Sequence, residues 1–286
     1  MTIKIILVLM NAARSDRGTL DLALLVATPR QAHVRVVFVR PDPRDVALYS
    51  GFGAEGVGLG DLMTQVEKEG ADASGRARKL FEDWCTDNEI PEAAPDSARV
   101  SASWRDEIGN LDQVVPQIGG LADLIVETGL HDRDLPLEQT TIEASLFGAG
   151  RPILIAPKTV PAGLGETAMI AWNGSREANR AVGAALELLA ACKKVLIYCE
   201  PEGNRRVADP ADLVAFLGAH GIAAYHVPTA KSGLSVGANL LTLCERECAS
   251  LLVMGAYTHG RFREMVLGGV TDHVLRHAGM PVLLAH

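Results

Sequence analysis

The sequence lacks a long hydrophobic run and is poor in aromatic and cationic residues. Aromatic residues make up 5% of the 286 positions, and 27 Lys and Arg face 35 Asp and Glu, for a formal net charge of -8. This charge argues against nucleic acid or a membrane surface as the main partner, because both are bound through clustered Lys and Arg. The apolar segment near the N-terminus is too short to cross a bilayer and no small-residue cleavage site follows it. We therefore expect a cytoplasmic protein.

Cysteine is also scarce, and its spacing indicates no disulfide framework. The five cysteines form an odd set without an export signal, which suits a reducing compartment. Cys244 and Cys248 lie four residues apart and would share one helix face, either as a thiol pair, as half of a metal site, or as apolar residues facing the core. Because no C-x-x-C motif or nearby histidine completes a tetrahedral site, we favour the core interpretation and expect no metal.

Familiar catalytic motifs are missing as well. The sequence contains no G-x-x-x-x-G-K-S/T or H-E-x-x-H segment and no convincing acid/base pair. We therefore name no catalytic residue and expect at most slow ATP hydrolysis at a bound nucleotide.

What the sequence does contain is an internal repeat. Three segments of the first half recur in the same order in the second: KIILVLMN (4–11) as ETAMIAWN (166–173), ADLIVETG (122–129) as ASLLVMGA (249–256), and GRPILIAP (150–157) as GMPVLLAH (279–286). A repeat at this scale predicts two homologous domains, residues 1–158 and 163–286, joined by a connector that contains Pro and Gly.

Within each half, short Val-, Ile- and Leu-rich runs alternate with segments of helical period, which is typical of a parallel sheet covered on both faces. In the second half we expect strands at 167–172, 194–199, 222–227, 250–255 and 281–285. Ser175 and Asp209 are suited to begin helices, and Gly221 to end one. The first half adds a Gly-rich stretch at 51–61 and a long amphipathic helix over 61–89.

A ligand of such a sheet would lie beyond the carboxyl ends of the strands, where the strand order reverses. In the second half, the strand ending near Gly255 opens into a glycine-containing loop, and Gly268 and Gly269 then begin a helix. Backbone N–H groups at a helix start attract anions, so we expect a phosphate there, with the Thr271 hydroxyl nearby.

The segments AWNGSREANRAV, MGAYTHGR and LGGVTDHVLRHAGMPVLL resemble the universal stress proteins, in a tandem arrangement that covers nearly the whole chain. This resemblance implies an α/β fold of two tandem flavodoxin-like, adenine-nucleotide-binding domains, each a five-stranded parallel sheet with helices on both faces. It also implies pairing through the last strands. In many members a nucleotide lies at the ends of the first two strands and a glycine loop. Carried over, the nucleotide-binding residues are Ala171, Trp172, Asn173, Tyr198, Cys199, Met254, Gly255, Gly260, Arg261, Gly268, Gly269, Val270 and Thr271.

The chain departs from the family pattern at several of these positions. Asn173 stands where an acidic residue is usual, although its amide can still accept a hydrogen bond. Four residues separate Gly255 from Gly260 and seven separate Gly260 from Gly268, so the middle glycine is shifted, and Gly269 replaces a hydroxyl residue. Two functions therefore remain: a stress protein that binds ATP or another adenylate, with Mg²⁺ as its companion ion, and a structural or interaction protein with a closed site.

Charged residues near the loop allow two interpretations. Arg261 or Arg263 could pair with phosphates and His259 with a ribose or metal, or these residues could form an Arg–Glu264 network on a solvated surface, which we favour. His273 and His277 have helical spacing that suits a metal, but a helix-surface or subunit-contact role needs no further ligands.

The first half predicts a degenerate nucleotide site. After ADLIVETG it has no second or third loop glycine, and Asp132, Asp134 and Glu138 would repel phosphate. We expect this half to serve as a built-in partner of the second, and the whole chain to be a candidate homodimer.

Overall fold

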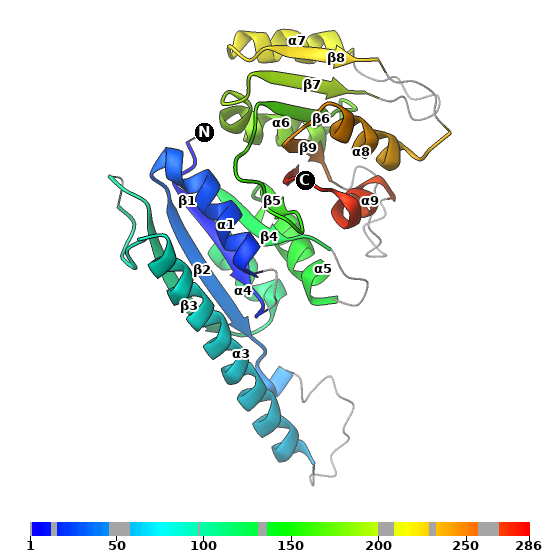
Figure 1. Ribbon diagram of the computed structural model, residues 1–286. Helices are drawn as coiled ribbons and strands as arrows, with labels where there is room; N and C mark the ends of the chain where they lie inside the picture. The colour runs from blue at the N-terminus through cyan, green and yellow to red at the C-terminus, as the bar shows by residue number, and fades with distance from the viewer. Residues whose placement is uncertain are drawn as a thin grey trace. The chain divides into compact units, whose positions relative to one another are not determined.

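A computed structural model describes residues 2–12, 16–45, 58–96, 98–130, 136–199, 209–228, 233–256 and 269–286 (Figure 1). The chain divides into two compact units. The N-terminal unit comprises Ile3–Glu127 and Pro136–Arg151, and the C-terminal unit comprises Met1–Thr2, Thr128–Leu135 and Pro152–His286. Within the described ranges, no helix is long and apolar enough to cross a membrane.

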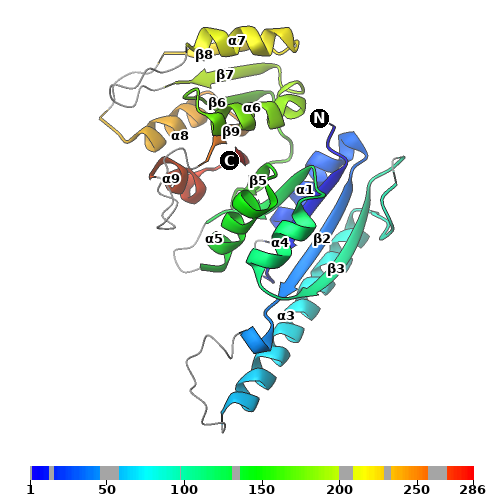
Figure 2. The ribbon, with the colours of Figure 1, turned by 180° about the vertical axis from the view of Figure 1, so that it is seen from behind.

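The N-terminal unit contains four parallel strands in the order β3-β2-β1-β4. Their bounds are β1 Ile5–Met10, β2 His33–Arg40, β3 Ser101–Ile108 and β4 Leu124–Thr128. Helices α1 and α3 lie in front of the sheet in Figure 1, and α4 lies in front of it in the reverse view of Figure 2. The helical elements are α1 Asp16–Ala27, the 3-10 turn η1 Thr28–Arg30, α3 Leu59–Asp87, α4 Leu111–Gly119, α5 Pro136–Glu143 and the π-helical turn η2 Ala144–Ala149.

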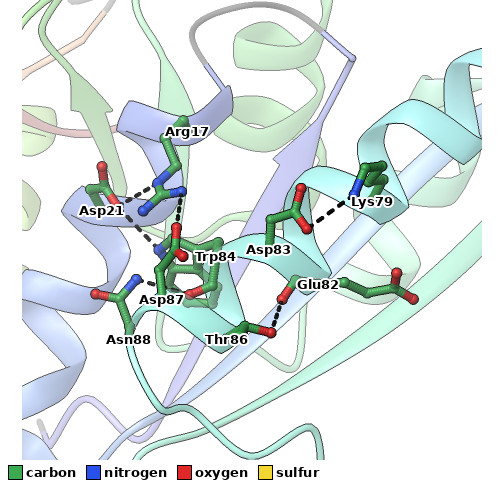
Figure 3. A network of polar contacts seen from close by, with 9 residues as sticks. All are labelled: Arg17, Asp21, Lys79, Glu82, Asp83, Trp84, Thr86, Asp87 and Asn88. Atoms are coloured by element: carbon green, nitrogen blue, oxygen red, sulfur yellow. Dashed lines mark hydrogen bonds and ion pairs between the residues drawn. The ribbon is translucent and has the colours of Figure 1, made fainter.

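A polar network holds the C-terminal end of α3 against α1 (Figure 3). Trp84 is fully buried, and its Nε1 donates a hydrogen bond to Asp21 Oδ1 at 3.1 Å. Arg17 pairs with the same Asp21 oxygen at 3.3 Å and with Asp87 Oδ2 at 2.9 Å. The large indole therefore enters the core without leaving its N–H group unpaired.

The C-terminal unit contains six strands in the order β5-β10-β9-β6-β7-β8, all parallel except β5. Their bounds are β5 Ile153–Ala156, β6 Thr167–Ala171, β7 Lys194–Tyr198, β8 Ala224–Val227, β9 Leu251–Gly255 and β10 Val282–Ala285. The helices are α6 Arg176–Leu189, α7 Pro210–Ala219, α8 Val236–Arg246 and α9 Gly269–His277. The expected α/β class, with parallel strands that alternate with helices in both halves, is confirmed.

Two helices of this unit, α6 and α7, begin at side-chain caps that the sequence indicates. Ser175 Oγ accepts a hydrogen bond from Ala178 N at 3.1 Å, and Asp209 Oδ1 accepts one from Ala211 N at 2.9 Å. These contacts satisfy backbone donors that a helix start leaves unpaired. Gly221 follows the end of α7 with φ +74°, a conformation that favours glycine.

The two repeated segments GRPILIAP and GMPVLLAH pair with each other. Strand β5 runs antiparallel to β10, with Leu154 opposite Leu283 and Ile155 opposite Val282. Strand β5 therefore completes the C-terminal unit although it precedes the connector in sequence. The homologous-domain boundaries at 158 and 163 remain a prediction based on the repeat.

The expectation that both members of the Cys244–Cys248 pair face the core is half wrong. Cys244 is fully buried in α8, but Cys248 is exposed and lies beyond the helix, which ends at Arg246. Cys248 has φ +51°, so the helical i,i+4 geometry on which the prediction depends does not reach it. The long helix expected over 61–89 is present as α3, whereas residues 51–57 of the Gly-rich stretch lie outside the described residues.

Candidate ligand site at the carboxyl ends of the strands

Three strands of the C-terminal unit end at the same level. Ala171, the last residue of β6, is in register with Tyr198 at the end of β7 and with Met254 on β9. The chain continues from β6 to β7 and β8 on one side and returns to β9 on the other, so the strand order reverses beside β6. This is the place where open α/β sheets bind ligands.

Asn173 lies just beyond β6 and is exposed. Its Oδ1 accepts a hydrogen bond from the backbone N–H of Ser175 at 3.0 Å, which fixes the turn into α6. Within the described part of the chain, its amide nitrogen has no hydrogen-bond partner. A ligand here would therefore meet a hydrogen-bond donor, whereas the sequence suggests an acceptor.

The neighbouring side chains expected to contact a ligand are buried and already paired. Trp172 is 7% exposed and its Nε1 donates to Asn179 Oδ1 at 2.9 Å, while Tyr198 is 4% exposed and its hydroxyl donates to the Val236 carbonyl at 3.4 Å. Cys199 is 8% exposed, and burial followed by the charge of Asp209 raises the pKa of its thiol. At these positions only the backbone is well placed to meet a ligand.

Gly255 ends β9 against the first turn of α6. A Cβ atom at this position would lie 2.4 Å from Ala178 N and 2.7 Å from the carbonyl carbon of Glu177, and both are backbone atoms. No side chain fits at such distances without displacing the helix. The requirement for glycine at Gly255 therefore has a structural cause, namely the close approach of α6.

Glu177 is a site residue that the sequence analysis missed. It is 7% exposed at the start of α6, beside Gly255. Burial opposes its ionisation, but hydrogen bonds from its own backbone N–H, from Arg176 and from Ser175, together with the charge of Arg176, outweigh burial and lower the pKa of the carboxyl. The ionised Glu177 carboxylate thus already provides the negative charge that the N-terminus of α6 favours, so a ligand anion is less favoured there. In the sequence, an acidic residue two positions after the expected helix cap Ser175 could have indicated a carboxylate in the first turn of α6.

Helix α9 begins at Gly269, directly after the glycine loop in sequence. A Cβ atom at Gly269 would meet no atom of the described residues within 4 Å, whereas Thr271 is 5% exposed and Val270 is half-buried. The remaining loop positions, namely His259, Gly260, Arg261, Arg263, Glu264 and Gly268, lie outside the described residues.

The chain is anchored where this loop leaves the sheet. Ala256 N donates to the Ala285 carbonyl at 2.9 Å, and the Ala256 carbonyl lies 3.2 Å from His286 Nδ1. Arg180 on α6 in turn donates to the His286 carbonyl at 2.8 Å. The base of the loop is thus tied to both β10 and α6.

The histidines of α9 contribute to helix packing. His273 and His277 stack with their ring centroids 4.4 Å apart, and a Cβ atom at Gly237 of α8 would lie 3.0 Å from the His273 ring. The absence of a side chain at Gly237 therefore makes room for His273. Among the described residues, no group of three or more His, Cys, Asp or Glu side chains is arranged to hold a metal ion.

The corresponding position of the N-terminal unit is acidic. Asn11 follows β1, and its Nδ2 donates to Glu138 Oε1 at 3.1 Å. Glu138 is 3% exposed and Asp16 is 2% exposed, while Asp132 and Asp134 lie outside the described residues. The Glu138 carboxyl group therefore already engages the Asn11 amide, the counterpart of Asn173. The degenerate nucleotide site of this half stays a prediction.

Comparison with known proteins places this geometry in a family context. Residues 166–286 match the Universal stress protein family. A universal stress protein from Archaeoglobus fulgidus DSM 4304 matches 98% of this chain and 95% of its own at 15% identity and a TM-score of 0.68. A putative universal stress protein from Pseudomonas aeruginosa UCBPP-PA14 matches 99% and 93% at 16% identity and a TM-score of 0.53.

These likenesses establish the fold over the full chain. A universal stress protein in complex with cAMP covers 56% of this chain at 13% identity and a TM-score of 0.31, which is too distant to transfer its ligand. No curated protein sequence matches the chain.

Proposed function

Because residues 166–286 match the Universal stress protein family, we propose that the C-terminal unit binds an adenine nucleotide, ATP or another adenylate, in a signalling or protective stress response. The main support for this proposal is that β6, β7 and β9 end side by side, with Ala171, Tyr198 and Met254 in register. The exposed Asn173 amide lies just beyond the end of β6. A planar base lying across such ends can use backbone groups of neighbouring strands.

Asn173 would act as a hydrogen-bond donor in this site. Because its Oδ1 is engaged by Ser175 N, its Nδ2 is the atom left for a ring nitrogen or a ribose oxygen. The buried Tyr198 and Cys199 side chains would leave the base to the backbone of this segment.

The phosphates would lie toward α9 and away from α6. Glu177 places a carboxylate at the start of α6, which would repel a phosphate, whereas at the start of α9 no atom of the described residues lies within 4 Å of a Cβ built at Gly269. Mg²⁺ would neutralise the remaining phosphate charge, with its oxygen ligands drawn mainly from the nucleotide and water.

The proposal is tested by calorimetric titration of ATP, ADP and adenosine into the wild type, the Asn173→Ala variant and the Gly269→Val variant. Asn173→Ala should weaken all three ligands by about 10-fold, the value of one hydrogen bond. Gly269→Val should weaken ATP by at least about 10-fold and leave adenosine unchanged, since its side chain enters open space near the phosphates alone. No binding of any of the three to wild type at millimolar concentration would remove the proposal.

A second candidate is a structural or interaction protein whose nucleotide site is closed. The burial of Thr271 and the carboxylate of Glu177 favour it, because both reduce what the site offers to a phosphate. Mass spectrometry of small molecules released from gently purified protein separates the two: a stoichiometric adenylate supports nucleotide binding, and repeated emptiness together with a negative titration supports the structural role. Homodimer formation belongs to either candidate and is measured by light scattering.

A further inference from the structure

A buried carboxyl group in the N-terminal unit has no role in the proposed nucleotide site. Glu127 lies on β4 and is 2% exposed. Strand alternation places its side chain on the same sheet face as Ile125. Helix α4 and the π-helical turn η2 cover this face, because a Cβ atom at Gly119 of α4 would lie 2.7 Å from Ala149 Cβ of η2 and 3.2 Å from Ile125 Cδ1.

The Glu127 carboxyl lies beside Ser145, which is fully buried in η2. Within the described part of the chain, neither Glu127 Oε1 nor Ser145 Oγ makes a hydrogen bond of ordinary geometry, although the Ser145 hydroxyl lies close enough to favour the charged carboxylate. An unpaired buried oxygen is tolerated far better on a neutral carboxyl than on a carboxylate, whose charge needs donors. The geometry thus favours the protonated form of Glu127.

The elements around Glu127 supply no compensating positive charge. Strand β1 and turn η2 carry no ionisable side chain, α4 carries only Asp112, and α5 carries Glu138 and Glu143. Arg151 lies just beyond η2, but its Nε donates to the Gly120 carbonyl at 3.1 Å. Every charge that these elements add is negative, which also opposes a carboxylate at Glu127.

We propose that Glu127 is a proton-operated lock between β4 and the π-helical turn η2. With its proton in place, the neutral carboxyl packs beneath Ser145 and η2 stays against the sheet. When the proton leaves to solvent, the buried carboxylate must acquire water, and η2 loosens from β4. A π-helical turn is a rare form of helix that is frequent at functional sites.

The lock would operate near neutral pH. Burial raises the pKa of Glu127 from the ordinary 4.5 to about 7, against a smaller lowering by the Ser145 hydroxyl. Since the folded protein holds this proton more tightly than the unfolded chain, the stabilisation is fully present below pH 4.5 and is lost as the pH rises through about 7. These values imply an unfolding equilibrium constant that rises on the order of 30-fold between pH 5.5 and 8.5.

Hydrogen exchange of the full chain tests the lock directly. Exchange of the η2 amides, corrected for the intrinsic effect of pH, should accelerate between pH 6 and 8.5 in the wild type and stay constant in Glu127→Gln, which keeps the shape without the charge. Glu143→Gln is the matched control, because Glu143 is a half-buried acid of the same layer whose carboxylate already accepts from Gln139. This control should retain the wild-type response.

Carbon-13 detection of the glutamate carboxyls keeps the proposal testable on the wild type even if Glu127→Gln does not fold. One resonance should titrate near pH 7, and it should move to higher pH in Ser145→Ala, which removes the one group that favours the charge. If every glutamate titrates below about pH 5.5, or if η2 exchange shows the same pH response in Glu127→Gln as in the wild type, the lock does not exist.

Discussion

At the scale of single residues, two glycines of the candidate site have different reasons to be glycine. We predict that Gly255→Ala destabilises the protein by about 2 kcal/mol or more, because the new methyl group would overlap backbone atoms of α6. Gly269→Ala is the matched control and should change stability by no more than about 0.5 kcal/mol, since no atom in the described part of the chain lies within 4 Å of the new methyl group. Urea denaturation of both variants measures the difference in their free energies of unfolding. Equal denaturation midpoints would show that the methyl group at position 255 does not clash with α6.

The same contrast explains how far the sequence predicts individual site residues. It places Asn173, Gly255 and Gly269 correctly at strand ends and a helix start, because hydrophobic runs and caps mark those points. It does not give the reason for Gly255, since the helix that approaches it lies far away in sequence. Nor does it reveal that Asn173 uses its oxygen within its own turn, which depends on the turn geometry.

At the scale of elements, the sequence predicts those whose signals are local. Buried strands such as β9 are continuous apolar runs, and α6 and α7 begin at the expected caps. The π-helical turn η2 is not predicted, because its extra residue per turn reflects packing against α4 and β4. Cys248 shows the limit of helical periodicity, which says which residues share a face but not where the helix ends.

The junction of α1 and α3 in Figure 3 allows a test of how it is held together. We predict that Asp21→Ala costs about 1–2 kcal/mol, because the buried Trp84 indole loses its acceptor. Asp83→Ala, on the same helix as Trp84, removes only the exposed pair with Lys79 and should cost about 0.5 kcal/mol or less. Chemical denaturation at one pH measures both; an equal loss would mean that the indole hydrogen bond adds nothing.

At the scale of the whole molecule, the pairing of β5 with β10 makes a prediction about fragments. A fragment of residues 163–286 would expose the β10 edge and its apolar neighbours, so we expect it to self-associate. A fragment of residues 150–286 keeps β5, so β10 stays paired and we expect this fragment to self-associate less at the same concentration. Light scattering after gel filtration compares them; a soluble, stable monomer of the shorter fragment would show that β5 is dispensable.

The place of β5 also bears on how such a chain could exchange parts with its relatives. In sequence, the connector after residue 158 separates the two repeats. In the structure, however, it lies inside the C-terminal unit and follows β5, a strand of that unit. A genetic crossover within the connector would combine β5 from one parent protein with β10 from another. The two hydrogen-bonded strands would then come from different parents. A crossover just before Pro152 would pass the ladder on intact. Surviving chimaeras of this architecture should therefore favour junctions that precede the repeated Pro-containing segment.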